Sequence, residues 1–319
     1  MECQERKTSP GVGKPAVTCT GHALSKEDSG VIVGKIGKMT GRGAETGMGH
    51  AAAEETNARI KDAQANTKQM RQAILLVSAG REIAGIRTAV ENRFPEYEVR
   101  SICTIPPGRE PLETALEQAA ADGITKLVVQ PVYLAEGYEY ACLSEKLNAC
   151  AAYFKEAALA RPLLSGAADR KTVASALAEE LSVYDDGATA VLCMAHGTEK
   201  AGNSLYYEFQ KVLEANVRLP VYLGVLKGEP SLEAVLCKLK EDGLKTENGA
   251  CKRIVLRPLM VSAGRHVLRD MAGDGANSWK KRLEAEGFSV ECIVKGLAEL
   301  TQVQALYTAH TKEAAERQE

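Results

Sequence analysis

The sequence has few of the features that mark several large classes of protein. No stretch approaches the roughly 18–20 consecutive apolar residues of a membrane span, so we expect none. No apolar segment follows the charges at the N-terminus, so we expect no secretory signal. The net charge is only −2, which gives no reason to expect a nucleic-acid partner. The remaining composition, 45% apolar and 26% charged, is that of a soluble globular protein, and a cytoplasmic location fits it best.

The cysteines lack the spacing of a disulfide framework or a zinc site. There are nine, which is an odd number, and no two of them form a CxxC pair. Several lie inside apolar runs of the sequence. We therefore expect buried, reduced thiols, as in a reducing compartment.

The first 70 residues contain no Phe, Tyr or Trp, and they hold 10 of the 28 glycines. A segment of this composition cannot bury enough apolar surface to offset the entropy that it would lose on ordering. Its Gly-x-Gly pieces neither follow a strand nor open an amphipathic helix, so they match a dinucleotide-binding loop only weakly. We interpret residues 1–70 as a mobile N-terminal extension.

From residue 71 onward, short apolar runs alternate with helix-forming segments. The pattern predicts strands at 73–78, 97–105, 127–134, 161–164, 190–194, 220–225, 254–261 and 289–294. It predicts helices up to about 92 and at 111–121, 140–159, 171–181, 204–216, 230–239, 278–286 and 297–315. This alternation favours an α/β fold with parallel sheets covered by helices on both faces. We expect a first domain over 71–185 and a second over 186–319, with a closing C-terminal helix.

The second half of this pattern repeats the first. The run AILLVSAG at 73–80 resembles AVLCMAHG at 190–197. Two further pairs of similar runs follow in the same order, 110–123 with 229–243 and 126–140 with 253–267. Three collinear matches indicate an internal duplication that produced two similar α/β domains.

The repeat also indicates where a ligand would bind. Ligands of open α/β sheets bind beyond the carboxyl ends of the strands, and two similar domains would place those ends on either side of a cleft. Ala79 and its counterpart His196 lie just past equivalent strands, as do Glu139 and its counterpart His266. Each ligand-type residue also has a structural explanation, as a histidine at a helix start, a loop histidine or a solvated glutamate.

Two imidazoles and one carboxylate suit a borderline divalent ion such as cobalt, nickel, iron or zinc. Imidazole also accepts protons near neutral pH. Insertion of a metal into a tetrapyrrole needs both properties, because two pyrrole N–H protons leave as the metal enters.

Longer motifs around these residues resemble those of one family. The segment MAHG at 194–197 is similar to that family's first histidine motif. The segment PLMVSAGRH at 258–266, with the DMA and SWK triplets after it, resembles the longer second motif, and 130–140 resembles the acidic segment of the first domain. Over residues 73–310 the chain resembles the anaerobic sirohydrochlorin cobaltochelatases of cobalamin biosynthesis. They are class II chelatases, a group that includes ferrochelatase.

The resemblance implies two similar domains, each with a parallel four-stranded sheet flanked by helices. It implies that His196 and His266 bind the metal, with Glu139 as third ligand or proton acceptor and His196 as the preferred base. The metal would be Co²⁺, bound as a substrate, and neither ATP nor an organic cofactor would be needed. Lys200 departs from the pattern, because some relatives carry a further histidine there.

Sirohydrochlorin carries many carboxylates, so cations near the cleft are candidates to bind it. Arg81 and Arg265 lie next to cleft positions, and Lys200 is a third candidate. Each of them is also compatible with a solvated surface charge. Three other residues are candidates to line the flat faces of the ring, with core packing as the alternative: Tyr133, Tyr138 and Met260.

Other functions stay open on the sequence alone. The ligand set also suits a chelatase for Fe²⁺ or Ni²⁺ on a related tetrapyrrole, since ligand type does not select cobalt. A non-catalytic protein that binds a tetrapyrrole or a metal in a cleft would have the same duplicated architecture. A metal-dependent hydrolase or oxygenase with these ligands has no further motif support. The sequence is compatible with a homo-oligomer and does not determine the oligomeric state.

Overall fold

The structure is a computed structural model, and it describes residues 70–81, 83–104, 112–197, 203–244 and 253–317. The predicted N-terminal extension therefore lies outside the described residues, apart from Met70. Lys200, a predicted substrate-binding residue, lies outside them as well.

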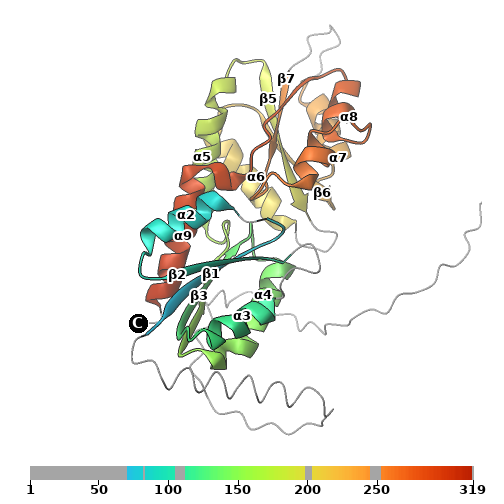
Figure 1. Cartoon of the computed structure of the whole chain (residues 1–319). Helices are drawn as coiled ribbons and strands as arrows, with labels where there is room; N and C mark the ends of the chain where they lie inside the picture. The colour runs from blue at the N-terminus through green and yellow to red at the C-terminus, as the bar shows by residue number, and fades with distance from the viewer. Residues whose placement is uncertain (1–69, 82, 105–111, 198–202, 245–252, 318–319) are drawn as a thin grey trace, which may run out of the picture. The chain divides into compact units, whose positions relative to one another are not determined.

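Within the described residues, the strands form two sheets of four (Figure 1). The first sheet consists of β1 (Gln72–Ser78), β2 (Glu98–Cys103), β3 (Lys126–Val132) and β4 (Glu156–Leu159). The second consists of β5 (Thr189–Gly197), β6 (Val221–Lys227), β7 (Arg253–Pro258) and β8 (Ser289–Cys292).

The two sheets are wound in the same way. Their strand orders are β2-β1-β3-β4 and β6-β5-β7-β8, and every neighbouring pair is parallel. In each sheet the chain begins at an inner strand, adds one edge strand, and then crosses over to build the other side. Two halves of identical topology confirm the predicted fold class, a duplicated α/β unit with parallel four-stranded sheets.

The inner strands β1 and β5 are buried on both faces, which explains why they read as unbroken apolar runs. In β1, Ile74 and Leu76 pack into one core, while Ala73, Leu75 and Val77 pack into another. The residues of β5 alternate between two cores in the same way. Side-chain alternation along a strand thus gives each sheet two apolar faces, and each face needs a covering layer of helices.

Helices supply those layers. The helices are α2 (Ala84–Arg93), α3 (Leu112–Ala121), α4 (Tyr138–Cys150), α5 (Ala167–Leu181), α6 (Ser204–Asn216), α7 (Leu232–Glu241), α8 (Trp279–Ala285) and α9 (Thr301–Glu316). Short helical turns lie at η1 (Ala151–Tyr153), η2 (Ser182–Tyr184), η3 (His266–Met271) and η4 (Leu297–Glu299). Helices α3 and α4 cover one face of the first sheet, and α7 and α8 cover the equivalent face of the second. Helices α2, α5, α6 and α9 contribute to one larger core that contains residues of both sheets.

The last helix of each half contacts the other half. Helix α5 packs against α6, and its Glu180 accepts a hydrogen bond from Arg257 Nε of β7 at 2.6 Å. Helix α9 packs against β3 and α2, and the Tyr307 hydroxyl donates to the carbonyl of Tyr133 at 2.8 Å. Figure 1 shows α9 beside α2 and the first sheet. This exchange of helices ties the two halves together.

One stretch of the sequence folds differently from its prediction. The helix predicted over 140–159 ends at Cys150, and the strand β4 follows at Glu156–Leu159. The strand predicted at 161–164 is irregular instead. The residues of β4, EAAL, prefer a helix by propensity, but they pair in parallel with β3 and complete the sheet. Tertiary pairing overrides local preference here.

Two further findings bear on the class of protein. In the described part of the chain, no helix is long and apolar enough to cross a membrane. The cysteines that the structure describes are all free thiols: Cys103, Cys142, Cys150, Cys193, Cys237 and Cys292. Burial raises the pKa of Cys193 to about 12, so this thiol is unreactive at neutral pH.

Candidate active site

The first predicted ligand, His196, lies at the carboxyl end of β5, where the strand ends in His196-Gly197. Gly197 has a φ of +69°, a conformation that side chains with a Cβ rarely adopt. A Cβ at this position would lie 2.3 Å from the carbonyl oxygen of Lys227 on the neighbouring strand. Glycine therefore permits both the turn and the close approach of β6, and together these place His196 at the end of the sheet.

The imidazole of His196 presents one defined nitrogen to the site. Its Nδ1 lies 3.0 Å from the carbonyl oxygen of Gly197, which can only accept a hydrogen bond, so Nδ1 carries the proton. Burial lowers the pKa of His196, and the charges of His266 and Lys227 lower it further. The ring is therefore neutral at neutral pH, with an unshared electron pair on Nε2. This is the form of imidazole that binds divalent metals.

The second predicted ligand, His266, opens the π-helical turn η3. Its Nδ1 lies 2.6 Å from Oδ2 of Asp270, one turn further along. Arg269 Nε donates to the other oxygen of the same carboxylate at 2.7 Å. Hydrogen bonds with Arg269 and then with His266 hold the pKa of Asp270 below its ordinary value, so the carboxylate is ionised and accepts the Nδ1 proton. The Nε2 atom of His266 is thereby left available.

Backbone contacts fix the loop that carries His266. The amide of Leu259 donates to the carbonyl of Met194 on β5 at 2.8 Å. The amide of Leu297 donates to the carbonyl of Met260 at 2.8 Å. A Cβ on Gly296 would lie 2.4 Å from the carbonyl oxygen of Val261, so glycine is needed for this packing. The loop is therefore held against the same strand end that carries His196.

These contacts bring the two imidazoles together. The ring centroids of His196 and His266 lie 5.0 Å apart, with an angle of 64° between the ring planes. Both Nδ1 atoms are engaged by acceptors, and both Nε2 atoms are left to bind an ion. The structure thus pairs the two histidines that the duplication places past β5 and β7.

The predicted third ligand, Glu139, lies in the first turn of α4 and is exposed. Its charge partly offsets the lowering of the His196 pKa by burial, and it adds to the effect of burial in raising the pKa of Tyr206, a partly buried tyrosine of α6. The carboxylate of the first half thus acts electrostatically on groups of the second. Over the described ranges, however, no three His, Cys, Asp or Glu side chains form a group that could hold a metal ion. The role of Glu139 as third ligand stays a prediction.

The predicted substrate-binding residues have mixed placements. Arg81 and Arg265 are exposed, Arg81 just after β1 and Arg265 directly before His266, and their role stays a prediction. Tyr138 is 65% exposed, as a residue that lines a ring face requires. Tyr133 is 8% exposed and packs in the core, which agrees with the alternative stated for this residue. Met260 is partly buried against the core of the second sheet.

Several residues of the site were not predicted from the sequence. Asp270 is the partner of His266, and its spacing of four residues after a histidine was the available signal. Tyr206 and Lys227 lie next to the His196-Gly197 turn, and only the pairing of β6 with β5 brings Lys227 there.

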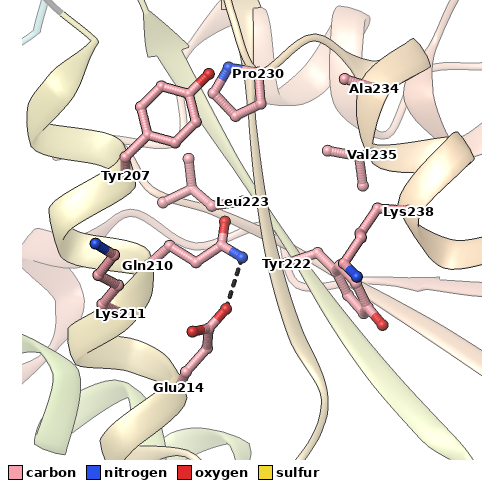
Figure 2. A pocket seen from close by; sticks show the side chains of 10 residues that line it. All are labelled: Tyr207, Gln210, Lys211, Glu214, Tyr222, Leu223, Pro230, Ala234, Val235 and Lys238. Carbon is pink, nitrogen blue, oxygen red and sulfur yellow. Dashed lines mark hydrogen bonds between the residues drawn. The ribbon is translucent and has the colours of Figure 1, made fainter. Parts of the chain in front are cut away.

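A groove of about 400 Å³ lies elsewhere, between α6 and α7 over the edge strand β6 (Figure 2). Figure 2 shows Leu223, Pro230 and Val235 among its apolar residues and Gln210 bonded to Glu214 on one wall. No histidine lines it. The groove is therefore separate from the imidazole pair.

Comparisons with known proteins agree with this geometry. The family model described as cobalt chelatase (CbiK) matches residues 72–316. A protein of Nitratidesulfovibrio vulgaris named sirohydrochlorin cobaltochelatase CbiKC is 32% identical over 222 residues, which cover 66% of this chain and 76% of that protein. The sirohydrochlorin cobaltochelatase of Salmonella typhimurium is 28% identical over 200 residues, covering 63% and 72%.

Solved structures show the same fold at lower identity. SirB from Bacillus subtilis, solved with Fe³⁺, matches with a TM-score of 0.52 at 16% identity, over 77% of this chain and 96% of that one. CbiX, described as the terminal enzyme of siroheme biosynthesis in denitrifying bacteria, matches with a TM-score of 0.51 at 17% identity, over 76% and 99%. The duplicated architecture described above is therefore shared with these proteins.

Proposed function

The chain belongs to the cobalt chelatase (CbiK) family, and from this premise we propose that it inserts Co²⁺ into sirohydrochlorin with release of two protons. The observation that carries the proposal is the pair of imidazoles of His196 and His266. Their Nδ1 atoms are both engaged and their ring centroids lie 5.0 Å apart, so both Nε2 atoms are available to one ion. A soft-to-borderline divalent metal with a preference for nitrogen fits this pair.

Each residue has a distinct task in the proposed reaction. His266 and His196 bind the incoming Co²⁺ through Nε2. An imidazole with Nδ1 protonated has a single electron pair in the ring plane, so His196 cannot hold the metal and a pyrrole proton at the same time. We infer that Nε2 of His196 accepts one proton only after the metal has moved to the tetrapyrrole nitrogens. Glu139, whose charge acts on His196, accepts the other.

Cobalt is the preferred substrate metal, and Fe²⁺ and Ni²⁺ are the alternatives that the ligand chemistry allows. We further propose that the reaction needs neither ATP nor an organic cofactor, because transfer of an ion between two nitrogen ligand sets needs only binding and proton transfer. A matrix of initial rates with each metal on sirohydrochlorin, without added nucleotide, tests both points. Faster insertion of Fe²⁺ or Ni²⁺ than of Co²⁺ would reassign the metal.

The central test replaces each ligand. His196→Ala and His266→Ala are each expected to lower the rate of Co²⁺ insertion by at least about 100-fold, because each removes a metal ligand and His196→Ala also removes a proton acceptor. The rate is followed anaerobically from the absorbance of the tetrapyrrole. His310→Gln is the control, since His310 is a buried histidine that contacts Asp169 and lies in α9. It is expected to lower stability and to leave the rate of Co²⁺ insertion by the folded protein unchanged.

A non-catalytic binding protein is the competing function, and the same experiment separates it. Such a protein would bind sirohydrochlorin or its cobalt complex tightly, and the wild type would not accelerate insertion above the rate in buffer. Unchanged insertion in both alanine variants would also refute the proposal.

A further inference from the structure

Lys227 lies beside the imidazole pair, although nothing in its local sequence suggests a role. It is the last residue of β6, and it pairs with Gly197 in the parallel register of β5 and β6. Val221, Leu223 and Val225 of β6 belong to the core shared by both halves, and Lys227 is the next residue in this alternating series. The lysine therefore follows the side of the second sheet that is packed against the first half.

The backbone of Lys227 is held firmly while its side chain is exposed. The carbonyl of Lys227 accepts a hydrogen bond from Nδ2 of Asn203 at 3.1 Å, and Glu229 accepts another through its carbonyl at 3.0 Å. The missing Cβ of Gly197 lets the same Lys227 carbonyl approach β5 closely. The base of the side chain is thus fixed relative to His196.

Within the described residues, the ammonium group of Lys227 has no ionic partner, whereas seven of the twelve lysines described there pair with a carboxylate. Lysines that do pair with a carboxylate are Lys126, Lys146, Lys238, Lys240, Lys280, Lys281 and Lys312. In the register of β5 and β6, Lys227 lies opposite Gly197, the residue that follows His196. An unpaired cation so close to two metal ligands repels a divalent metal. An anion that joins the complex would remove this repulsion.

We propose that Lys227 is a specificity-determining residue that binds a carboxylate of the tetrapyrrole and, through its charge, couples tetrapyrrole binding to Co²⁺ binding. The inference rests on the proposed function, because that function supplies a polycarboxylate ligand to this edge of the sheet. Without the tetrapyrrole, the cation weakens Co²⁺ binding at the imidazoles. With it, the carboxylate neutralises the cation, so Co²⁺ binds more tightly. This coupling is reciprocal, because each ligand raises the affinity for the other by the same factor. It favours an order of binding in which the tetrapyrrole binds before Co²⁺.

The test measures the binding of both ligands by Lys227→Met, which keeps most of the length of the side chain and removes the charge. The KM for sirohydrochlorin is expected to rise about three- to tenfold, and the increase should shrink at high ionic strength. The Kd of Co²⁺ for the tetrapyrrole-free protein is expected to fall about two- to fivefold, measured by calorimetry with Co²⁺ alone. Opposite changes for the two ligands distinguish an electrostatic role from a loss of structure, which would weaken both.

Two further variants complete the design. Lys227→Arg keeps the charge and is expected to retain both wild-type constants. Lys171→Met removes the same charge from an exposed position on α5, and both constants should stay unchanged. An unchanged KM in Lys227→Met, or weaker binding of both ligands, would overturn the inference. Failure of the wild type to insert Co²⁺ would instead refute the proposed function. The Kd for sirohydrochlorin, measured by direct titration of the wild type and Lys227→Met, would then test the role of Lys227.

Discussion

Asp270 determines which nitrogen of His266 is available to the proposed metal ion. Its carboxylate also accepts from Arg269, and it accepts the Nδ1 proton of His266 with Nδ1 and Oδ2 2.6 Å apart, which fixes both the tautomer and the orientation of the ring. An imidazole that must choose between tautomers and rotamers binds metal less tightly, because ordering it costs free energy in each binding event. His196 obtains the same control from the backbone carbonyl of Gly197.

Asp270→Asn is therefore expected to weaken Co²⁺ binding about 10- to 100-fold, as the loss of a carboxylate behind a histidine ligand does in other metal sites. The measurement is calorimetric titration with Co²⁺ in the absence of tetrapyrrole. Asp274→Asn, a neighbouring exposed aspartate that pairs with Lys280, is the control and should bind normally. Wild-type affinity in Asp270→Asn would show that His266 is oriented without its carboxylate.

The histidine pair was predictable from the sequence because the repeat singles out the positions past equivalent strands. Asp270 and Lys227 were not. Asp270 contacts His266 within a π-helical turn. Its spacing of four residues after the histidine was a signal, but the sequence did not predict that turn. Lys227 is 31 residues from His196 in the chain, and only the register of two parallel strands makes it a neighbour. Residue type identifies candidate ligands, but their supporting partners depend on three-dimensional pairing.

At the scale of elements, the turn after β5 depends on glycine for two separate reasons. Gly197 has a positive φ, and it also leaves no room for a Cβ against Lys227. Gly187 offers a matched comparison, since it has a φ of +73° but no heavy atom within 4 Å of its hypothetical Cβ. The two positions separate backbone strain from steric conflict.

Gly187→Ala is expected to lower the free energy of unfolding by about 1–2 kcal/mol, the usual cost of a left-handed alanine. Gly197→Ala should cost clearly more, and it should also reduce Co²⁺ affinity because His196 is displaced with the strand end. Urea unfolding gives the stabilities, and calorimetry gives the affinities. Equal costs at the two glycines would mean that β6 moves aside without penalty.

The elements themselves were mostly predictable, with an instructive exception. Strands β1 and β5 are continuous apolar runs, which is the usual sequence pattern of a parallel strand that is buried on both faces. Strand β4 was mistaken for the end of a helix, because four residues rich in alanine carry no strand signal of their own. It forms because β3 offers an unpaired edge, and that edge exists only in the folded sheet.

At the scale of the whole molecule, one charged cluster joins segments that are far apart in the chain. Arg161 donates to Asp169 at the start of α5 and to Glu313 of α9. Asp169 also accepts the backbone amide of Gly166 at 2.8 Å, and its second oxygen lies 3.2 Å from Nε2 of His310. The cluster thus fastens the final helix to the first half.

The pH dependence of stability should reflect this cluster. Burial acts to raise the pKa of Asp169, but His310, Gly166 and Arg161 together lower it below its ordinary value. The folded state therefore favours the ionised carboxylate, and its contribution is present above the unfolded pKa of about 3.9 and is lost as pH falls through the lower folded value. Asp169→Asn should be less stable than the wild type at pH 6, and the difference should shrink below about pH 4. Urea unfolding at several pH values is the measurement, and a difference independent of pH would contradict it.

No sequence pattern showed which sheet the last helix covers. Amphipathic periodicity predicted a closing helix at 297–315, and α9 is there, but its apolar side fits either half equally well in principle. The choice emerges from contacts such as that of Tyr307 with Tyr133.

That placement has a consequence for biosynthesis on the ribosome. The first half has all its strands once residue 159 has emerged, yet the helix that seals one of its faces ends at residue 316. At ordinary translation speeds, the gap amounts to on the order of ten seconds. During this interval the nascent chain would expose an incomplete apolar layer around β3, and a chaperone that recognises such surfaces would have its longest opportunity before α9 has been synthesised.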